Sequence, residues 1–299
     1  MDKTRLAIVG FGNLGRYALE AVQMEPDLAL SGVLDPAQAG RRYDDTAARI
    51  AGRLDDLEPF SVALLCVPTL QVAEIAPHYL ARGISTVDAF DLHGTAIADL
   101  QQNLDRHAKA GGCTAISAAG WDPGIDSLLR AVLKILIPRG KTFTNYGPGM
   151  SLGHSVAART IPGVKDAVAL TYPLGYGRHR RQVYIIPEPG TDVPCLEQAI
   201  LAHRYFAGDE TTVTVAEDLS LFRDHGHGAH IERKGLSGRT HNQRVACDIA
   251  VNNPAATSQV MVCAARAARR CQPGAYTLLD LPLNYFLAES AREAARELA

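Results

Sequence analysis

The sequence lacks the features that mark secreted, membrane-bound or nucleic-acid-binding proteins. Its six cysteines form no C-x-x-C pair, and it has neither a leader-like segment nor a run of about 20 apolar residues. Lys and Arg number 30 against 32 acidic residues, the net charge is −2, and no basic tract is long enough for a nucleic-acid groove. We therefore expect a cytoplasmic protein with reduced thiols that binds neither membrane nor nucleic acid.

Motifs typical of hydrolases and metal sites are also missing. The sequence has no G-x-S-x-G elbow and no H-E-x-x-H pair. His225, His227 and His230 lie close together in sequence, but their spacing is not typical of a zinc site and no cysteine is near them. We expect no bound metal. With 299 residues, 47% of them hydrophobic, the chain is long enough for two domains with separate cores.

One strong nucleotide-binding pattern is present near the start of the chain. It reads Gly10-Phe11-Gly12-Asn13-Leu14-Gly15. An apolar run precedes it, and an amphipathic run follows it as far as Val22. A strand, a tight glycine turn and a helix whose first N–H groups face a pyrophosphate make up a dinucleotide-binding unit. We predict a nicotinamide dinucleotide site here, rather than a glycine turn without a function.

Apolar segments and amphipathic helical segments alternate over the first 118 residues. The apolar segments are residues 5–9, 29–34, 62–67, 84–87 and 113–117. Residues 62–67 are continuously apolar, as expected for a strand buried on both faces. The alternation predicts an α/β fold with a Rossmann-type doubly wound parallel sheet, whose ligands bind at the carboxyl ends of the strands.

From residue 119 the pattern predicts a second domain of α+β type with a mixed or antiparallel sheet. Helices are expected over 125–136, 254–270 and 289–298, and alternating segments over 167–172, 182–186, 211–222, 230–233 and 245–251. We predict a dinucleotide-binding domain over 1–118, to which 272–299 return, and a substrate-binding and dimerisation domain over 119–271.

Residues that follow the predicted strands are candidates for the rim of the cofactor site. They are Asp35, Cys66, Val67, Pro68, Thr69, Asp88, Ala89 and Phe90. A carboxylate at Asp35 would accept hydrogen bonds from the adenosine ribose and repel a 2′-phosphate, which favours NAD over NADP. Asp35 could instead be a solvated turn residue, and Arg41 or Arg42 could still attract a 2′-phosphate. Asp88 and Asp91 could likewise be ordinary turn aspartates.

Several candidate substrate residues have a structural alternative. Asp122 and Asn253 each precede a proline, which is typical of a helix N-cap followed by a first-turn proline. Thr171 ends one predicted strand and Arg181 begins the next, so a hairpin would bring together a hydroxyl and a guanidinium that suit a carboxylate. Arg181 could equally be an exposed strand residue.

Blocks spread through nearly the whole chain resemble the meso-diaminopimelate dehydrogenase family, particularly its shorter members. The blocks are residues 9–17, 65–69, 86–94, 119–124, 145–155, 232–235 and 252–255. The Trp-Asp-Pro-Gly and Gly-Pro-Gly-Met-Ser sequences are specific to that family. The resemblance implies a metal-free homodimer of lysine biosynthesis. Such enzymes oxidatively deaminate the D-centre of meso-2,6-diaminopimelate to L-2-amino-6-oxopimelate and ammonia, with reduction of NADP or NAD, and also run in reverse.

The resemblance also implies roles for particular residues. Asp91 and Asp122 would be the catalytic residues that hold the reacting amino group, with Trp121 and Asn253 shaping that end of the site. Three residues would bind the distal L-centre: Thr171, Arg181 and His227. The residues expected to line the pocket beside them are Tyr146, Met150, Ser151, Leu152 and Gly153.

Three departures from the family pattern leave alternatives open. Asp35 and Pro36 stand where arginines that suit NADP are usual, Tyr146 stands where Phe is common, and Leu152 where Met is common. The alternatives are a broader D-amino-acid dehydrogenase that aminates 2-oxo acids, an aspartate-, homoserine- or sugar-type dehydrogenase, and a dinucleotide sensor without catalysis.

Overall fold

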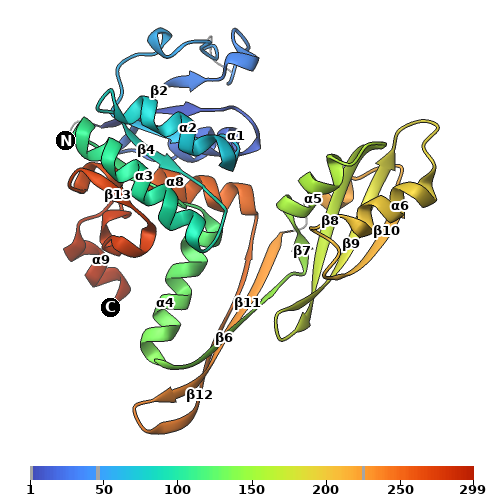
Figure 1. Cartoon of the computed structure of the whole chain (residues 1–299). Helices are drawn as coiled ribbons and strands as arrows, with labels where there is room; N and C mark the ends of the chain where they lie inside the picture. The colour runs from blue at the N-terminus through green and yellow to red at the C-terminus, as the bar shows by residue number, and fades with distance from the viewer. Residues whose placement is uncertain (1–2, 45–47, 224–225) are drawn as a thin grey trace. The chain divides into compact units, whose positions relative to one another are not determined.

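The computed structural model describes residues 3–44, 48–223 and 226–299, which fall into two compact units (Figure 1). Unit 1 comprises Met1–Leu129 and Pro254–Ala299, and unit 2 comprises Arg130–Asn253. Within the described residues, no helix combines the length and the apolar character needed to span a membrane.

Unit 1 is built on a six-stranded parallel sheet. Its strands are β1 (Thr4–Val9), β2 (Leu28–Leu34), β3 (Val62–Leu65), β4 (Ser85–Asp88), β5 (Thr114–Ile116) and β13 (Gly274–Tyr276). Its helices are α1 (Asn13–Gln23), α2 (Thr69–Leu80), α3 (Thr95–Gly111), α8 (Asn253–Arg270) and α9 (Ala291–Leu298), and α4 (Asp126–Leu136) runs from unit 1 into unit 2. The strand order β13-β5-β4-β3-β1-β2 confirms the predicted doubly wound Rossmann-type sheet.

Both faces of this sheet are covered by helices, which explains the continuous apolar sequence of its central strands. In β3, Val62 and Leu64 pack into a core with α1 and α8, whereas Ala63 and Leu65 pack into a second core with α2 and α3. All four side chains are at most 1% exposed. Alternate residues of a strand point to opposite faces, so a strand covered on both sides has no polar positions.

The observed division of the chain differs from the predicted boundaries at residues 118 and 271. The prediction assigned the helix over 254–270 to the second domain. In the structure, α8 contributes Met261, Val262, Ala264 and Ala265 to the core beneath the parallel sheet, and each is fully buried. Only one residue separates α8 from the preceding strand of unit 2, so neither composition nor a linker marks this boundary in the sequence.

Unit 2 contains two sheets. Its strands are β6 (Arg139–Tyr146), β7 (Gly149–Met150), β8 (Val164–Gly175), β9 (Arg178–Pro187), β10 (Glu210–Val215), β11 (His227–Ser237) and β12 (Thr240–Val251), and its short helices are α5 (Leu152–Arg159), α6 (Val193–Ala202) and α7 (Ser220–Arg223). One sheet, β10-β9-β8-β7, is mixed, because β10 runs parallel to β9 while the other pairs are antiparallel. The other, β12-β11-β6, is antiparallel.

Two segments of unit 2 differ from the sequence-based expectation. The strand β6 was not predicted, because Arg139–Tyr146 is polar and half-exposed and shows no clear alternation. The single segment expected over 211–222 divides into β10 and α7. The packing core of this unit lies between the mixed sheet and helices α5 and α6, and includes the buried Phe206 from the turn before β10.

Candidate functional site

The glycine turn after β1 has the geometry required to bind a pyrophosphate. A Cβ at Gly10 (φ +91°) would lie 2.5 Å from the carbonyl oxygen of Cys66, and one at Gly15 would lie 2.2 Å from the carbonyl oxygen of Gly10. At Gly12, by contrast, no atom of the described residues lies within 4 Å of that position, and no described side chain caps α1. The first N–H groups of α1 are therefore open to a phosphate, so the residues present fit a dinucleotide.

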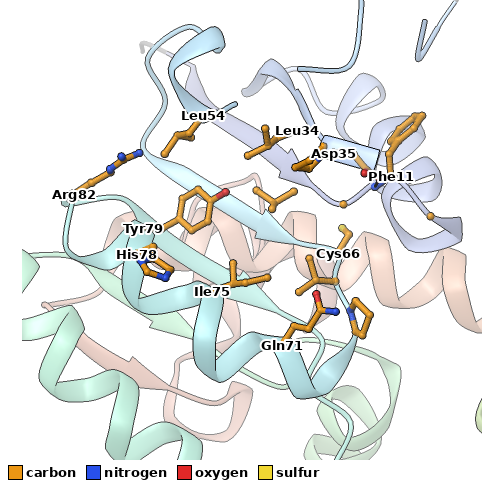
Figure 2. A pocket seen from close by; sticks show the side chains of 16 residues that line it. Phe11, Leu34, Asp35, Leu54, Cys66, Gln71, Ile75, His78, Tyr79 and Arg82 are labelled. Carbon is orange, nitrogen blue, oxygen red and sulfur yellow. Dashed lines mark hydrogen bonds between the residues drawn. The ribbon is translucent and has the colours of Figure 1, made fainter. Parts of the chain in front are cut away.

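A cavity of about 700 Å³ lies beside this turn, a volume typical of cofactor pockets. Its lining includes seven of the predicted cofactor residues, which are Gly10, Phe11, Gly12, Asp35, Cys66, Val67 and Pro68. Figure 2 shows Phe11 and Asp35 at one end of the cavity, and His78, Tyr79 and Arg82 at the other. The cavity thus extends well beyond the glycine turn.

Sequence reasoning missed the α2 side of this cavity. Its lining there consists of Gln71, Ile75, His78, Tyr79 and Arg82, which recur at helical spacing. This spacing does not single them out, because Ile75 and Tyr79 fit an apolar core face of the helix equally well. In the described part of the connection from β2 to β3, the only helical elements are the 3₁₀ turns Pro36–Gln38 and Leu54–Asp56. A full helix there would cover this face of α2.

Asp35 follows β2 and is anionic at neutral pH. Its Oδ2 accepts hydrogen bonds from Phe11 N–H and Gln38 Nε2, both at 2.9 Å, and its Oδ1 accepts from Ala37 N–H at 3.0 Å. Burial raises the pKa of this carboxyl, but the hydrogen bonds outweigh burial and hold the pKa below its usual value. A carboxylate can accept about four hydrogen bonds, so Oδ1 retains capacity for a ribose hydroxyl.

Asp88, which was expected at the cofactor rim, is instead fully buried. Its carboxylate accepts hydrogen bonds from Phe90 N–H (3.0 Å), Ser117 Oγ (2.8 Å) and Ala118 N–H (3.3 Å). Burial raises its pKa to about 6, although these hydrogen bonds act in the opposite direction. Asp88 therefore ties the end of β4 to the end of β5, including Ala118, whose positive φ (55°) is rare for a residue with a Cβ.

The two predicted catalytic carboxylates lie on loops after β4 and β5. Asp91 is exposed, and its Oδ1 accepts a hydrogen bond from Thr69 Oγ1 at 2.6 Å. Asp122 Oδ1 lies 3.8 Å from His93 Nε2, on the loop that also carries Asp91. Within the turn Trp121–Ile125, Asp122 has an extended backbone (φ −132°, ψ 122°) directly before Pro123, which is the backbone geometry of an N-cap residue.

Trp121 is held beneath these loops by α8. Its backbone N–H donates to Thr257 Oγ1 at 3.1 Å, and a Cβ at the preceding Gly120 would lie 3.0 Å from Thr257 Cγ2 and 3.6 Å from Ala89 Cβ. The Trp121 side chain is 4% exposed, and its Nε1 is buried with no hydrogen-bond partner among the described residues. Such an indole N–H can donate to a ligand that reaches it.

The remaining predicted cofactor residues do not line the cavity within the described structure. They are Asn13, Leu14, Gly15, Thr69, Ala89 and Phe90. Leu14 packs against the core between the sheet and α8, and Phe90 is buried in the core formed with α2 and α3. Arg41 and Arg42 are exposed and are likewise not among the lining residues.

In unit 2, the β8–β9 hairpin brings Thr171 and Arg181 together. The two residues are direct partners in the strand register, and Arg181 Nη1 donates to Thr171 Oγ1. Thr171 is fully buried and Arg181 is 8% exposed, which excludes the alternative of an exposed strand arginine. Arg181 Nε also donates to Asp209 Oδ2 at 2.7 Å. A buried guanidinium with a hydroxyl beside it is suited to a carboxylate.

Three aromatic side chains stand together in the same unit. The ring of Tyr146 lies 5.7 Å from the rings of both His179 and His227. Tyr146 N–H donates to His179 Nε2 at 2.9 Å, and its hydroxyl accepts from Arg130 Nη2 at 3.0 Å. His227 Nδ1 lies 3.1 Å from the carbonyl oxygen of Met150, so this nitrogen carries the proton.

The predicted lining residues 150–153 lie on β7 and at the start of α5. Ser151 Oγ lies 2.8 Å from His154 Nδ1, and a Cβ at Gly153 would lie 3.7 Å from Tyr205 Cε1. Burial, and secondarily the charge of Arg181, lowers the pKa of His154 to about 4, so its ring is neutral at pH 7. The Leu152 side chain lies outside what the structure describes, and Asn253 is the half-buried first residue of α8.

A meso-diaminopimelate D-dehydrogenase of Bacteroides fragilis is 46% identical to this chain over 286 residues, which cover 95% of each protein. The chain belongs to the meso-diaminopimelate D-dehydrogenase family. A family model for the diaminopimelic acid dehydrogenase C-terminal domain matches residues 120–176, the region that includes Trp121, Tyr146 and Thr171. This diaminopimelate dehydrogenase homologue is therefore an oxidoreductase with a nicotinamide cofactor.

Solved structures share the fold over the whole chain. Corynebacterium glutamicum DAP dehydrogenase in complex with DAP superimposes with a TM-score of 0.88 and 29% identity, covering 100% of both chains. An engineered D-amino acid dehydrogenase bound to NADP+ gives a TM-score of 0.82 and 28% identity, covering 99% of this chain and 100% of the other.

Metal-ligating side chains are not clustered in the described part of this dehydrogenase. No group of three or more His, Cys, Asp and Glu residues there is placed to hold a metal ion. His230 Nδ1 lies 2.5 Å from Asp248 Oδ1 on the neighbouring strand β12, whereas His227 contacts Met150. His225 lies outside the described residues.

Proposed function

We propose that this enzyme catalyses the NAD(P)-dependent reversible oxidative deamination of the D-centre of meso-2,6-diaminopimelate to L-2-amino-6-oxopimelate and ammonia. The observation that supports this substrate most directly is the buried Thr171–Arg181 pair. Asp209 already pairs with Arg181 Nε, and the remaining N–H groups of the guanidinium, with the Thr171 hydroxyl beside them, suit the second carboxylate that a diacid carries far from its reacting carbon. The names of the curated relatives, including the one from B. fragilis, support the same substrate.

At the reacting end, Asp91 and Asp122 would bind the amino group. Hydride leaves the α-carbon only when the nitrogen lone pair is free, so one carboxylate must accept a proton from the ammonium group. The nicotinamide, when bound, accepts this hydride. Water then adds to the substrate imine, and the same carboxylates can move a proton to the nitrogen, which leaves as ammonia. Asp91 is exposed and hydrogen-bonded to Thr69, so it can exchange protons with solvent.

At the distal end, Thr171 and Arg181 would bind the carboxylate of the L-centre, and His227 would border the same group. Binding energy gained there holds the D-centre in place without taking part in the chemistry. We therefore expect substrates that lack the distal carboxylate to react with lower kcat/KM.

For the cofactor, we propose a preference for NAD over NADP. The Asp35 carboxylate is anionic and lines the cavity, where it would accept a ribose hydroxyl and repel a 2′-phosphate. Asp35→Arg should therefore lower kcat/KM with NAD and raise it with NADP by about tenfold or more. If the ratio of kcat/KM with NADP to kcat/KM with NAD is unchanged in this variant, Asp35 does not face the ribose.

The substrate proposal is tested by initial rates with meso-diaminopimelate and with simple D-amino acids. Arg181→Ala should raise the KM for meso-diaminopimelate by an amount equivalent to about 2–4 kcal/mol of binding. Arg180→Ala is the matched control, because Arg180 is the exposed neighbour on β9 and stacks over Tyr172. The alternative is a broader D-amino-acid dehydrogenase, which would use D-amino acids without a distal charge as well as it uses meso-diaminopimelate. The hydroxyl of Tyr146 could favour this alternative by changing the wall of the substrate pocket.

We also propose that the enzyme is a cytoplasmic homodimer. Three apolar side chains on the unit 2 part of α4 are strongly exposed, with Val132 at 47%, Ile135 at 79% and Leu136 at 52%. Adjacent apolar side chains of this kind are typical of a protein interface. The cysteines in the described structure are free thiols, which supports a reducing compartment.

A further inference from the structure

We propose that Asp209 is a positioning residue, which orients the guanidinium of Arg181 so that one edge faces the distal carboxylate of the substrate. This inference rests on the proposed function, since it requires a substrate with a distal carboxylate. Asp209 lies in the turn between α6 and β10, and no motif in the sequence pointed to it. Its Oδ2 accepts a hydrogen bond from Arg181 Nε at 2.7 Å.

The fold places Asp209 beside Arg181 through strand pairing. The strand β10 runs parallel to β9 with Thr211 opposite Arg181, and Asp209 lies two residues before Thr211. The turn is anchored to the core of unit 2. Asp209 N–H donates to the carbonyl oxygen of Phe206 at 3.1 Å, and the Phe206 side chain is 1% exposed. The carboxylate is thus held by backbone structure on one side of the guanidinium.

The hydrogen bonds of Arg181 within the protein use Nε and one of the two N–H groups of Nη1, so both N–H groups of Nη2 remain for a ligand. Nε donates to Asp209 and Nη1 donates to Thr171. Nη2 has no hydrogen-bond partner among the described residues, yet it is not among the buried unpaired atoms, so it keeps contact with solvent. Because Thr171 Oγ1 accepts from Arg181, its own hydroxyl proton remains to be donated. An arriving carboxylate would therefore meet Nη2 and the Thr171 hydroxyl.

The charge of Asp209 cannot be its contribution to this site. An anion beside Arg181 lowers the attraction between the guanidinium and a second carboxylate. What Asp209 supplies is a fixed acceptor for Nε, which removes the rotation of a long side chain before the substrate binds. The side chain of Arg181 is 10% exposed and that of Asp209 is 23% exposed, so water competes weakly for this hydrogen bond.

This distinction between charge and orientation decides the choice of variants. Asp209→Asn keeps an acceptor oxygen at the same reach but removes the charge. Asp209→Ala removes the acceptor, and Asp209→Ser leaves a hydroxyl on a shorter side chain that no longer reaches Arg181 Nε. We expect Asp209→Ala and Asp209→Ser to raise the KM for meso-diaminopimelate about tenfold with little change in kcat. We expect Asp209→Asn to stay within about threefold of the wild type.

Two controls separate positioning from a general loss of structure. In the Arg181→Ala background, Asp209→Ala should have no further effect on KM, because Asp209 acts through Arg181. Glu210→Ala, which removes the exposed neighbouring carboxylate on β10, should leave KM unchanged. The Tm of each variant shows that it is folded, and Asp209→Ser provides a second variant in case Asp209→Ala does not fold.

The outcomes distinguish this inference from the proposed function. If Arg181→Ala raises the KM for meso-diaminopimelate while Asp209→Ala and Asp209→Ser leave it unchanged, the positioning role is overturned and the proposed function stands. A KM for Asp209→Asn as high as that for Asp209→Ala also overturns it, since charge would then be the operative property. If the wild type shows no preference for meso-diaminopimelate over D-norleucine, which has no distal carboxylate, the proposed function itself fails.

Discussion

The hydroxyl of Tyr146 connects its aromatic ring to a neighbouring arginine. Its OH accepts a hydrogen bond from Arg130 Nη2, and its ring lies 5.7 Å from the rings of both His179 and His227. Phenylalanine at this position would have the same ring but no acceptor for the arginine. The hydroxyl therefore adds a link between α4 and β6 within unit 2.

We predict that Tyr146→Phe lowers the free energy of unfolding by about 1–2 kcal/mol, because a hydrogen bond to a charged, partly buried group is lost. Denaturant unfolding monitored by circular dichroism measures this change. Tyr176→Phe is the matched control, since Tyr176 is 83% exposed, and it should change stability by less than about 0.5 kcal/mol. Equal stability of the wild type and Tyr146→Phe would contradict a structural contribution of the hydroxyl.

Asp88 leads to a prediction about pH. Burial raises the pKa of this carboxyl to about 6 in the folded chain, against an ordinary value of 3.8. A group whose pKa is higher in the folded state holds its proton there at pH values where the unfolded chain has lost it. The contribution of Asp88 to stability is therefore greatest below about pH 4, and it is lost as the pH rises to about 6.

We expect Asp88→Asn to remove this dependence, because the amide keeps an acceptor for Phe90 and Ala118 but does not ionise. The free energy of unfolding of Asp88→Asn minus that of the wild type should increase between pH 4 and pH 7, by about 2–3 kcal/mol. Urea unfolding at several pH values measures this difference, in which other titrating groups cancel. A difference that is constant with pH would show that Asp88 titrates normally.

At the scale of elements, the turn between β1 and α1 contains glycines that are needed for two different reasons, one for folding and one for ligand binding. Gly10 adopts a positive φ against the carbonyl of Cys66, so the fold itself requires it. Gly12 faces open space among the described residues, so the fold does not require it. Its lack of a side chain matters only if a ligand approaches the backbone closely, as a pyrophosphate does.

We therefore predict opposite outcomes for two substitutions in this turn. Gly12→Ala should leave the Tm within about 2 °C of the wild type but raise the Kd for the nicotinamide cofactor about tenfold or more, as measured by fluorescence titration. Gly10→Ala should lower the Tm markedly, since its strain costs about 1–3 kcal/mol. Unimpaired cofactor binding by Gly12→Ala would place the pyrophosphate elsewhere.

For the whole molecule, the exposed apolar side chains of α4 bear on assembly. We predict that Ile135→Glu shifts the enzyme from dimer to monomer, because it places a charge on a surface that the proposed interface would remove from water. Analytical ultracentrifugation at micromolar concentration measures this shift. Met24→Glu alters a side chain that is 81% exposed after α1, and it should leave the mass unchanged. A wild type that sediments as a monomer would refute the proposed dimer.

The sequence by itself determined those features that depend on residues close together in the chain. The glycine turn, the first five strands of the parallel sheet and the β8–β9 hairpin follow from local periodicity and from the backbone freedom of glycine, whereas the short strand β13 was not predicted. These patterns also indicated that Asp35 ends a strand and that Thr171 and Arg181 would face each other, because strand register extends regularly from the turn.

Tertiary structure alone decided which distant residues share an environment. It placed α8 in the core of unit 1, gave α2 one side of the cofactor cavity, buried Asp88 between two strand ends and set Asp209 against Arg181. None of these has a local signal, because the same Asp, Tyr or apolar helix face is compatible with solvent, core or ligand. Packing between segments far apart in the chain determines which environment each one has.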